Sequence, residues 1–453
     1  MPLGHSPSQM SPTILQLIFG SLMLLTYGLI AFGILHKTVA ALSGALVLAA
    51  LAVFLGVIPE YDKIHELLGH DLNVLGVIIG TSLLVDLAGQ SGLFHFLAIK
   101  VVKKTGGDPV RLFLALQLFT FGLTAVLTIV PAMLIVSGLV LVICRNLRLP
   151  LTPYLLGIAF SSNAAAFCTF ASGLPTLMIG SAAKIPYVQF LQVSLPFALV
   201  SLVVCYLFTR RFFRKDLRAP SDPEEKKILQ ETVEAFDEWA LAPDRGAFIR
   251  AATILALTIL GFAFAGVLHL GLDFIAFGGG VLMLLFHGKS VEKTIAKVNW
   301  TVILFFTGLF VIVGLVKEVH LLDRIASSLT SMTGQSVPLA VTIFTWFSGI
   351  ASAIVDNIPV AATMIPMVPG MEGIPHEPLW WSLILGSNLG GSATPIGSIS
   401  CVIALHALDH EAGIKLGWGT FLAVGGVLTL IQLTLACLYL IGLFSLGLMP
   451  PLS

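Results

Sequence analysis

Two apolar runs, each interrupted in its middle, follow one another between residues 348 and 400. Asp-Asn-Ile-Pro breaks the first run at 356–359, and a stretch rich in Ser, Asn and Gly breaks the second at 387–395. Pro has no N–H to donate and Gly does not hold a helix, so both runs are expected to unwind there. Hydrocarbon tolerates unwound backbone only where protein or a water-filled cavity covers it. The pattern therefore predicts membrane helices whose breaks face an internal site.

The rest of the chain is apolar enough to be embedded in a membrane as well. Only 11% of the residues are charged and the mean hydropathy is +0.98, whereas a soluble protein has about 25% charged residues. A spanning helix needs about 20 apolar residues. Apolar runs cover 13–34, 38–58, 72–90, 111–148, 151–183, 187–209, 248–270, 271–287, 299–316, 338–370, 379–408 and 417–447. We predict an all-α polytopic membrane protein, with the first run kept as a membrane helix.

The two halves of the chain resemble each other weakly. Offsets of 225 to 228 residues relate Thr128 to Asp356, Gly80 to Gly308, Asn163 to Asn388 and Thr169 to Thr394. Such internal symmetry is typical of transporters built from inverted repeats. We divide the chain into an N-terminal transmembrane helix at 1–35, membrane repeat 1 at 36–209, a charged, solvated linker at 210–247 and membrane repeat 2 at 248–447.

Each repeat is expected to contain a re-entrant hairpin, at 111–148 and 338–370, and a broken transmembrane helix. Hairpins that enter from opposite faces leave most Lys and Arg residues on the side of the linker. The exceptions are Lys63, Lys184, Lys317 and Arg324. Because basic residues gather on the cytoplasmic side, we predict an inner-membrane protein with a cytoplasmic linker and both termini outside.

Asp356 is the only acidic residue placed deep in a break. A carboxylate in the membrane costs several kcal/mol unless it is paired or protonated. Asp356 is therefore predicted to couple transport by carrying a proton or binding a cation. A helix cap is a compatible alternative. Neither broken segment contains Lys or Arg, so the lining favours a neutral polyhydroxyl solute, a small monoanion or Na+.

Neutral donors, acceptors and glycines surround the breaks in both halves. The predicted substrate- or ion-binding residues are Asp356, Asn357, Ser387, Asn388, Gly390, Gly391, Ser392, Thr394, Gly397 and Ser398, with Thr128, Ser162, Asn163, Thr169 and Ser172 in the first half. The alternative for each is that it satisfies irregular backbone or permits close helix packing. Asp86, late in the run 72–90, is expected at the membrane interface or packed, outside the site.

The motif at 355–359 (Val-Asp-Asn-Ile-Pro) and the loop at 389–398 (Leu-Gly-Gly-Ser-Ala-Thr-Pro-Ile-Gly-Ser) resemble the ion transporter superfamily. Within it, the chain is similar to the arsenite permease and NhaD-type sodium/proton antiporter branch, with its citrate transporter-like domain. The resemblance implies two inverted repeats and ion-coupled exchange, with Asp356, Asn357 and the loop 387–398 in the site. Two departures lie in the first half: Thr128 and Ile129 replace an acidic or Asn residue, and alanines at 164–166 replace paired glycines.

These patterns favour an ion-coupled secondary transporter that exports arsenite- or antimonite-like inorganic solutes in exchange for protons. A Na+/H+ antiporter is the alternative, and a permease for another small anion, such as a carboxylate or silicate, ranks below it. An enzyme is not expected, since neither loop has a His or Lys to activate a nucleophile. Nor do we expect a metal site or a cofactor other than coupling H+ or Na+, because the five cysteines are scattered.

The predicted partners are the small inorganic solute and the lipid bilayer, with a homodimer and a cytoplasmic partner at the linker as further expectations. A nucleic-acid partner is not expected, because the formal net charge is +0.

Overall fold

The computed structural model describes residues 10–69, 72–218, 223–240, 242, 244–287 and 291–452. Parts of the predicted N-terminal helix segment (1–9) and of the linker (219–222, 241 and 243) lie outside the described residues, as does Lys289 on the predicted cytoplasmic side.

Every regular element among the described residues is a helix, which confirms the all-α prediction. Ten helical segments in this part of the chain are long and apolar enough to cross a membrane. They are α1 (Pro12–Ala31), α2 (Lys37–Phe54), α4 (Leu72–Gln90), α6 (Pro109–Leu127), α7 (Ile129–Asn146), α10 to α11 (Tyr187–Phe212), α13 (Arg245–Leu268), α16 (Trp300–Glu318), α18 (Val337–Ile354) and α22 to α23 (Trp418–Ser445).

The helices follow the same order in both halves. The helices α5 (Leu93–Lys103) and α17 (Leu321–Thr333) begin 228 residues apart, as do α7 and α19 (Asn357–Met364). The broken helices are α8 (Leu151–Ala165) with α9 (Leu174–Ala182), and α20 (His376–Gly390) with α21 (Ile399–His406). Their corresponding elements begin 225 residues apart. The element boundaries therefore reproduce the offsets that the sequence suggested.

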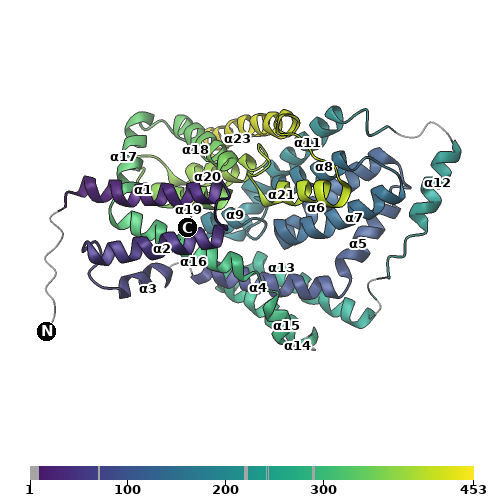
Figure 1. Cartoon of the computed structure of the whole chain (residues 1–453), viewed down its shortest axis with the longest axis horizontal. Helices are drawn as coiled ribbons and strands as arrows, with labels where there is room; N and C mark the ends of the chain where they lie inside the picture. Colours follow the sequence, from purple (N-terminus) through teal and green to yellow (C-terminus); the bar gives the residue numbers. More distant parts are fainter. Residues whose placement is uncertain are drawn as a thin grey trace.

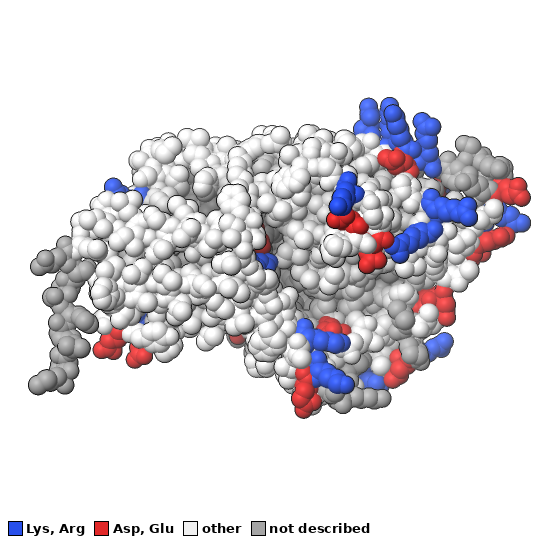
Figure 2. Space-filling model, viewed as in Figure 1, with Lys and Arg blue, Asp and Glu red and all other residues white. Residues whose placement is uncertain are grey.

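The two hairpins lie toward opposite ends of the molecule. Figure 1 shows α6 and α7 in the half that carries α12 (Pro223–Glu234), and α18 and α19 in the half from which the N-terminus extends. This is the arrangement expected of inverted repeats. Which end faces the cytoplasm stays a prediction. It agrees with Figure 2, where charged side chains gather at the α12 end of the face drawn.

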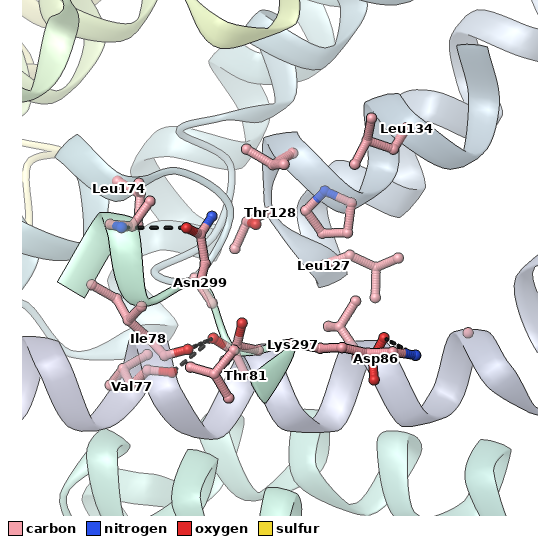
Figure 3. A pocket seen from close by; sticks show the side chains of 18 of the residues that line it. Val77, Ile78, Thr81, Asp86, Leu127, Thr128, Leu134, Leu174, Lys297 and Asn299 are labelled. Atoms are coloured by element: carbon pink, nitrogen blue, oxygen red, sulfur yellow. Dashed lines mark hydrogen bonds and ion pairs between the residues drawn. The ribbon is translucent and has the colours of Figure 1, made fainter. Parts of the chain in front are cut away.

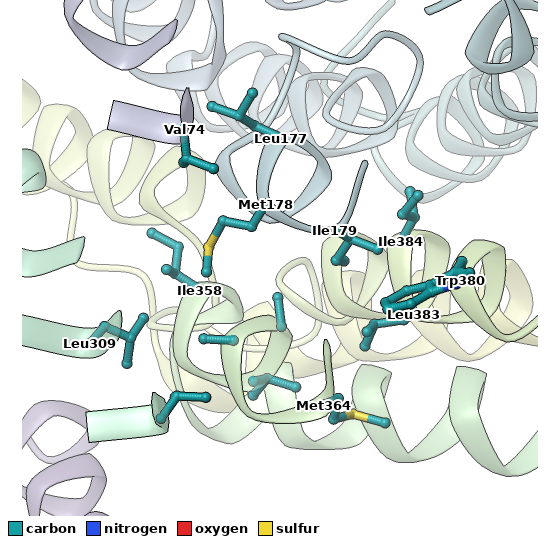
Figure 4. Close-up of a cluster of buried hydrophobic side chains, with 14 of the residues drawn as sticks. Val74, Leu177, Met178, Ile179, Leu309, Ile358, Met364, Trp380, Leu383 and Ile384 are labelled. Atoms are coloured by element: carbon teal, nitrogen blue, oxygen red, sulfur yellow. The ribbon is translucent and has the colours of Figure 1, made fainter. Parts of the chain in front are cut away.

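Outer helices are exchanged between the repeats. The helix α2 packs against α16 of the second half, and α14 (Leu272–His287) packs against α4 of the first half. The half-helices are exchanged in the same way, since α9 packs against α19 and α20, while α21 packs against α7 and α8. Figure 4 shows this core, where Met178 of α9 extends toward Ile358 of α19, with Val74 of α4 in the same cluster. The four interrupted segments are therefore held together in one body.

The linker is docked on the membrane body through part of its length. Leu229 and Val233 of α12 are buried, and the Trp239 ring lies 4.5 Å from the ring of Phe96 on α5. Glu238 forms an ion pair with Lys103 at the end of α5. The sequence predicted a solvated linker. The charged side chains fit that description, but the apolar side chains of α12 pack against the protein.

Candidate functional site

Asp356 lies in the break between α18 and α19. Its Oδ1 accepts a hydrogen bond from the N–H of Ile358 at 3.3 Å and so caps α19. Its Oδ2 lies 3.3 Å from the Nζ of Lys37, the first residue of α2. One carboxylate thus serves both as a helix cap and as half of an ion pair.

Lys37 is a candidate site residue that the sequence analysis did not include. It comes from a helix far outside the two broken segments, and its Nζ lies 5.4 Å from the centre of the buried Phe305 ring on α16. The side chains of Lys37 and Asp356 are only 26% and 16% exposed. The broken segments themselves contain no Lys or Arg, but Lys37 brings a cationic group to one of them from outside.

The break in the first hairpin is formed by Thr128, with φ at 76° and ψ at 168°. This backbone region is nearly restricted to Gly, and a residue with a side chain occupies it at a cost of about 1–3 kcal/mol. Thr128 and Val130 line a small cavity of about 30 Å³ together with Asn357 and Ile358. The tips of the two hairpins therefore meet across this cavity, and one is neutral while the other carries Asp356.

A larger cavity of about 810 Å³ opens beside the first tip. Figure 3 shows Thr81 and Asp86 of α4 on one wall and Thr128 with Leu127 opposite, while Asn299 lies near the start of α16. Asp86 accepts a hydrogen bond from Gln90 at 2.6 Å and lies 3.6 Å from the Nζ of Lys297. Asp86 was expected at the interface or packed, yet it lines this cavity with a lysine partner.

The two related asparagines tie the repeats together. Asn163 Nδ2 donates to the hydroxyls of Ser392 and Ser398, each at 2.9 Å, and its Oδ1 accepts from Ser400 at 2.6 Å. Asn388 donates to Thr176 of the first repeat at 3.0 Å. Both asparagines are 1% exposed and line none of the cavities described above. In this conformation the two asparagines and the hydroxyls that they bind form a buried hydrogen-bonded network, which we call the frame.

The broken-helix loops are fastened to the hairpins by equivalent bonds. The Thr169 hydroxyl donates to the carbonyl of Ala125 at 2.7 Å, and the Thr394 hydroxyl donates to the carbonyl of Ala353 at 2.6 Å. Other predicted residues are also used locally. Hydrogen bonds join Ser162 to Thr124, Ser172 to Thr169 and Ser387 to Leu383. The glycines at 390, 391 and 397 allow neighbouring backbone to approach closely.

One polar atom in this frame is unpaired. The Oδ1 of Asn388 is buried and has no hydrogen-bond partner among the described residues. Buried polar atoms normally find a partner, and an amide oxygen is a common ligand of hard cations. Of the two asparagines, Asn388 is therefore the one whose amide oxygen has no partner, whereas Asn163 uses its own Oδ1.

Comparison with known proteins places this architecture in a family. The family model described as "Citrate transporter" matches residues 27–386. The chain belongs to this citrate transporter family. A 46 kDa membrane protein of Mycobacterium leprae is 30% identical over 93% of this chain and 97% of its own length. A transporter of Mycobacterium tuberculosis is 29% identical over 91% of this chain and 95% of its own length.

A solved structure has a similar fold to this protein. The YdaH transporter of Alcanivorax borkumensis matches 96% of this chain and 99% of its own, with a TM-score of 0.61 and 14% identity. The family and its relatives support a multi-pass membrane transporter and not an enzyme. The resemblance to the ion transporter superfamily is thus supported at the level of the citrate transporter family. The finer assignment to arsenite permeases or NhaD-type antiporters stays a prediction.

Proposed function

We propose that this protein is a secondary transporter that couples a small oxygen-bearing solute to a cation, H+ or Na+, which loads on Asp356. The observation that carries the proposal is the position of this carboxylate. It lies at the tip of one hairpin, beside the cavity shared with the other tip. Ionisable residues within membrane-spanning segments are rare, are usually paired and often mark ion or substrate pathways, and the partner of Asp356 is Lys37.

A small carboxylate is the solute class we favour. Two observations support it: Lys37 supplies a cation beside the hairpin tips, and the family model is described as a citrate transporter. The sequence favoured a neutral polyhydroxyl solute, a small monoanion or Na+, because the broken segments contain no cation. With Lys37 beside Asp356, the anion becomes the favoured member of that set.

Exchange of arsenite- or antimonite-like solutes for protons is the second candidate. The hydroxyl and amide groups of Thr128 and Asn357 favour it, because they can bind a neutral oxyacid without a charged partner. Na+/H+ exchange at Asp356 is the third. The predicted homodimer, the cytoplasmic partner of the linker and the sidedness of the termini stay predictions.

Flux measurements in proteoliposomes test the proposal. Purified protein is reconstituted, and uptake of labelled pyruvate, citrate, arsenite and Na+ is followed under imposed pH or Na+ gradients. We expect a carboxylate to accumulate only with a cation gradient, and Asp356→Asn to abolish this dependence while the protein still inserts. The control is Asp62→Asn, whose side chain is 85% exposed. Gradient-driven uptake in Asp356→Asn equal to that of the wild type would refute the role of Asp356.

A further inference from the structure

The ammonium of Lys37 lies directly against the carboxylate of Asp356. Its Nζ is 3.3 Å from Oδ2, and no other charged side chain among the described residues forms an ion pair with either partner. The neighbours that hold Lys37 are uncharged: the Phe305 ring lies beneath its Nζ, and the hydroxyl of Thr38 binds the carbonyl of Thr301 on α16. A titratable group that also contacts α19 is Tyr27 of α1, which is hydrogen-bonded to Thr363 at 2.9 Å.

We propose that Lys37 is the anion-binding group of the transport site and that Asp356 neutralises it until a cation loads. This inference rests on the proposed function and extends it to the charge of the solute. When H+ or Na+ binds Asp356, the ammonium of Lys37 loses its partner. A solute with a carboxylate or another oxyanion then restores the pair.

The charges of the four possible states give the direction of coupling. The empty site contains one ammonium and one carboxylate and is neutral. The site with both a cation and a monoanion is also neutral. A site with only the cation has a net positive charge, and a site with only the anion has a net negative charge. Uncompensated charge in the membrane is expensive, so only the empty and the doubly loaded forms cross readily. The solute and cation therefore move together, with one cation for each anionic charge.

The first repeat has no equivalent pair. Thr128 occupies the position related to Asp356, and α14, the counterpart of α2, begins with Leu272 where α2 begins with Lys37. These symmetry-related positions therefore contain one charge-compensating pair. The Asp86–Lys297 pair beside Thr128 comes from α4 and the segment before α16, which are not the positions related to Asp356 and Lys37. A monocarboxylate, which needs one counter-charge, should suit the pair of Lys37 and Asp356 better than fully ionised citrate.

The test compares Lys37→Gln and Lys37→Arg with the wild type in proteoliposomes. Radiolabelled pyruvate, radiolabelled Na+ and a trapped pH-sensitive dye report the three fluxes. In Lys37→Gln the empty site is negative and the cation-loaded site is neutral. We therefore expect cation-driven pyruvate uptake to fall by at least about tenfold, since one partner of a half-buried charge pair is lost. At the same time, Na+ or H+ exchange that needs no anion should appear.

A gain of cation exchange is a result that simple loss of structure would not produce. Lys37→Arg keeps the charge and should retain coupled pyruvate uptake. The matched control is Lys63→Gln, which removes an exposed lysine paired with Glu66 on the surface. Wild-type pyruvate uptake in Lys37→Gln would overturn the inference, and so would loss of uptake without anion-independent cation exchange. If uptake of every solute by the wild type is independent of the cation gradient, the proposed function itself is refuted. That outcome differs from the two above, which refute only the role of Lys37.

Discussion

Gly80 and Gly308 are equivalent positions of the two repeats, and each lets its helix cross the backbone of a helix from the other half. A Cβ on Gly80 of α4 would lie 2.3 Å from the carbonyl carbon of Ala276 on α14. A Cβ on Gly308 of α16 would lie 2.7 Å from the carbonyl carbon of Ala41 on α2. Small residues of this kind allow close helix contact in membranes. The exchanged outer helices therefore depend on two symmetry-related contacts.

Replacing either glycine by alanine should separate these helix pairs. We expect Gly80→Ala and Gly308→Ala each to destabilise the protein by about 1–3 kcal/mol, the usual cost of overpacking. Thermal unfolding in detergent measures the effect. Gly122→Ala in α6 is the control, because a Cβ there meets nothing within 4 Å. Equal melting temperatures for Gly80→Ala and Gly122→Ala would contradict the close crossing.

The frame of asparagines is asymmetric, and substitution should reveal it. Asn163→Ala removes three hydrogen bonds to serines of the second repeat. Each buried group left unpaired costs about 1–3 kcal/mol, although Ser398 and Ser400 retain their bond to each other. After Asn388→Ala, Thr176 still donates to the carbonyl of Ala166. We expect Asn163→Ala to lower the melting temperature more than Asn388→Ala, and the reverse order would refute this account of the frame.

A substitution at the strained tip of the first hairpin is expected to stabilise the protein, unlike the substitutions above. Thr128→Gly removes a side chain from a backbone region that favours Gly, at the cost of a more flexible unfolded chain. We expect a net stabilisation of about 1 kcal/mol, measured by thermal unfolding. Thr342→Gly in the interior of α18 is the control and should destabilise by about a few tenths of a kcal/mol, the difference between Thr and Gly in a helix. A loss of stability in Thr128→Gly would show that this backbone is not strained.

The sequence could predict the elements of this fold because their signals are local. Apolar run length, Pro and Gly locate the spans and the breaks, and the constant offsets relate the halves. The contact between Lys37 and Asp356 has no such signal, because its partners are 319 residues apart. The sequence also could not predict which polar residues of the broken loops line a cavity. A serine or asparagine in an unwound loop has the same sequence signature whether it lines a cavity, as Asn357 does, or is buried in a frame, as Ser392 is.

The docking of the linker should weaken in acid. Lys103 hydrogen-bonds Glu238 and holds the pKa of this carboxyl below its usual value. The pair therefore stabilises the docked linker fully at pH values above the ordinary glutamate pKa of about 4.3, and the contribution is lost as the pH falls through the lower folded value. We expect Trp239 to leave its contact with Phe96 in that acidic range. The fluorescence difference between wild type and Trp239→Phe follows this change. Glu238→Gln, which cannot titrate, should lack the transition, and an unchanged acid transition in that variant would exclude the ion pair as its cause.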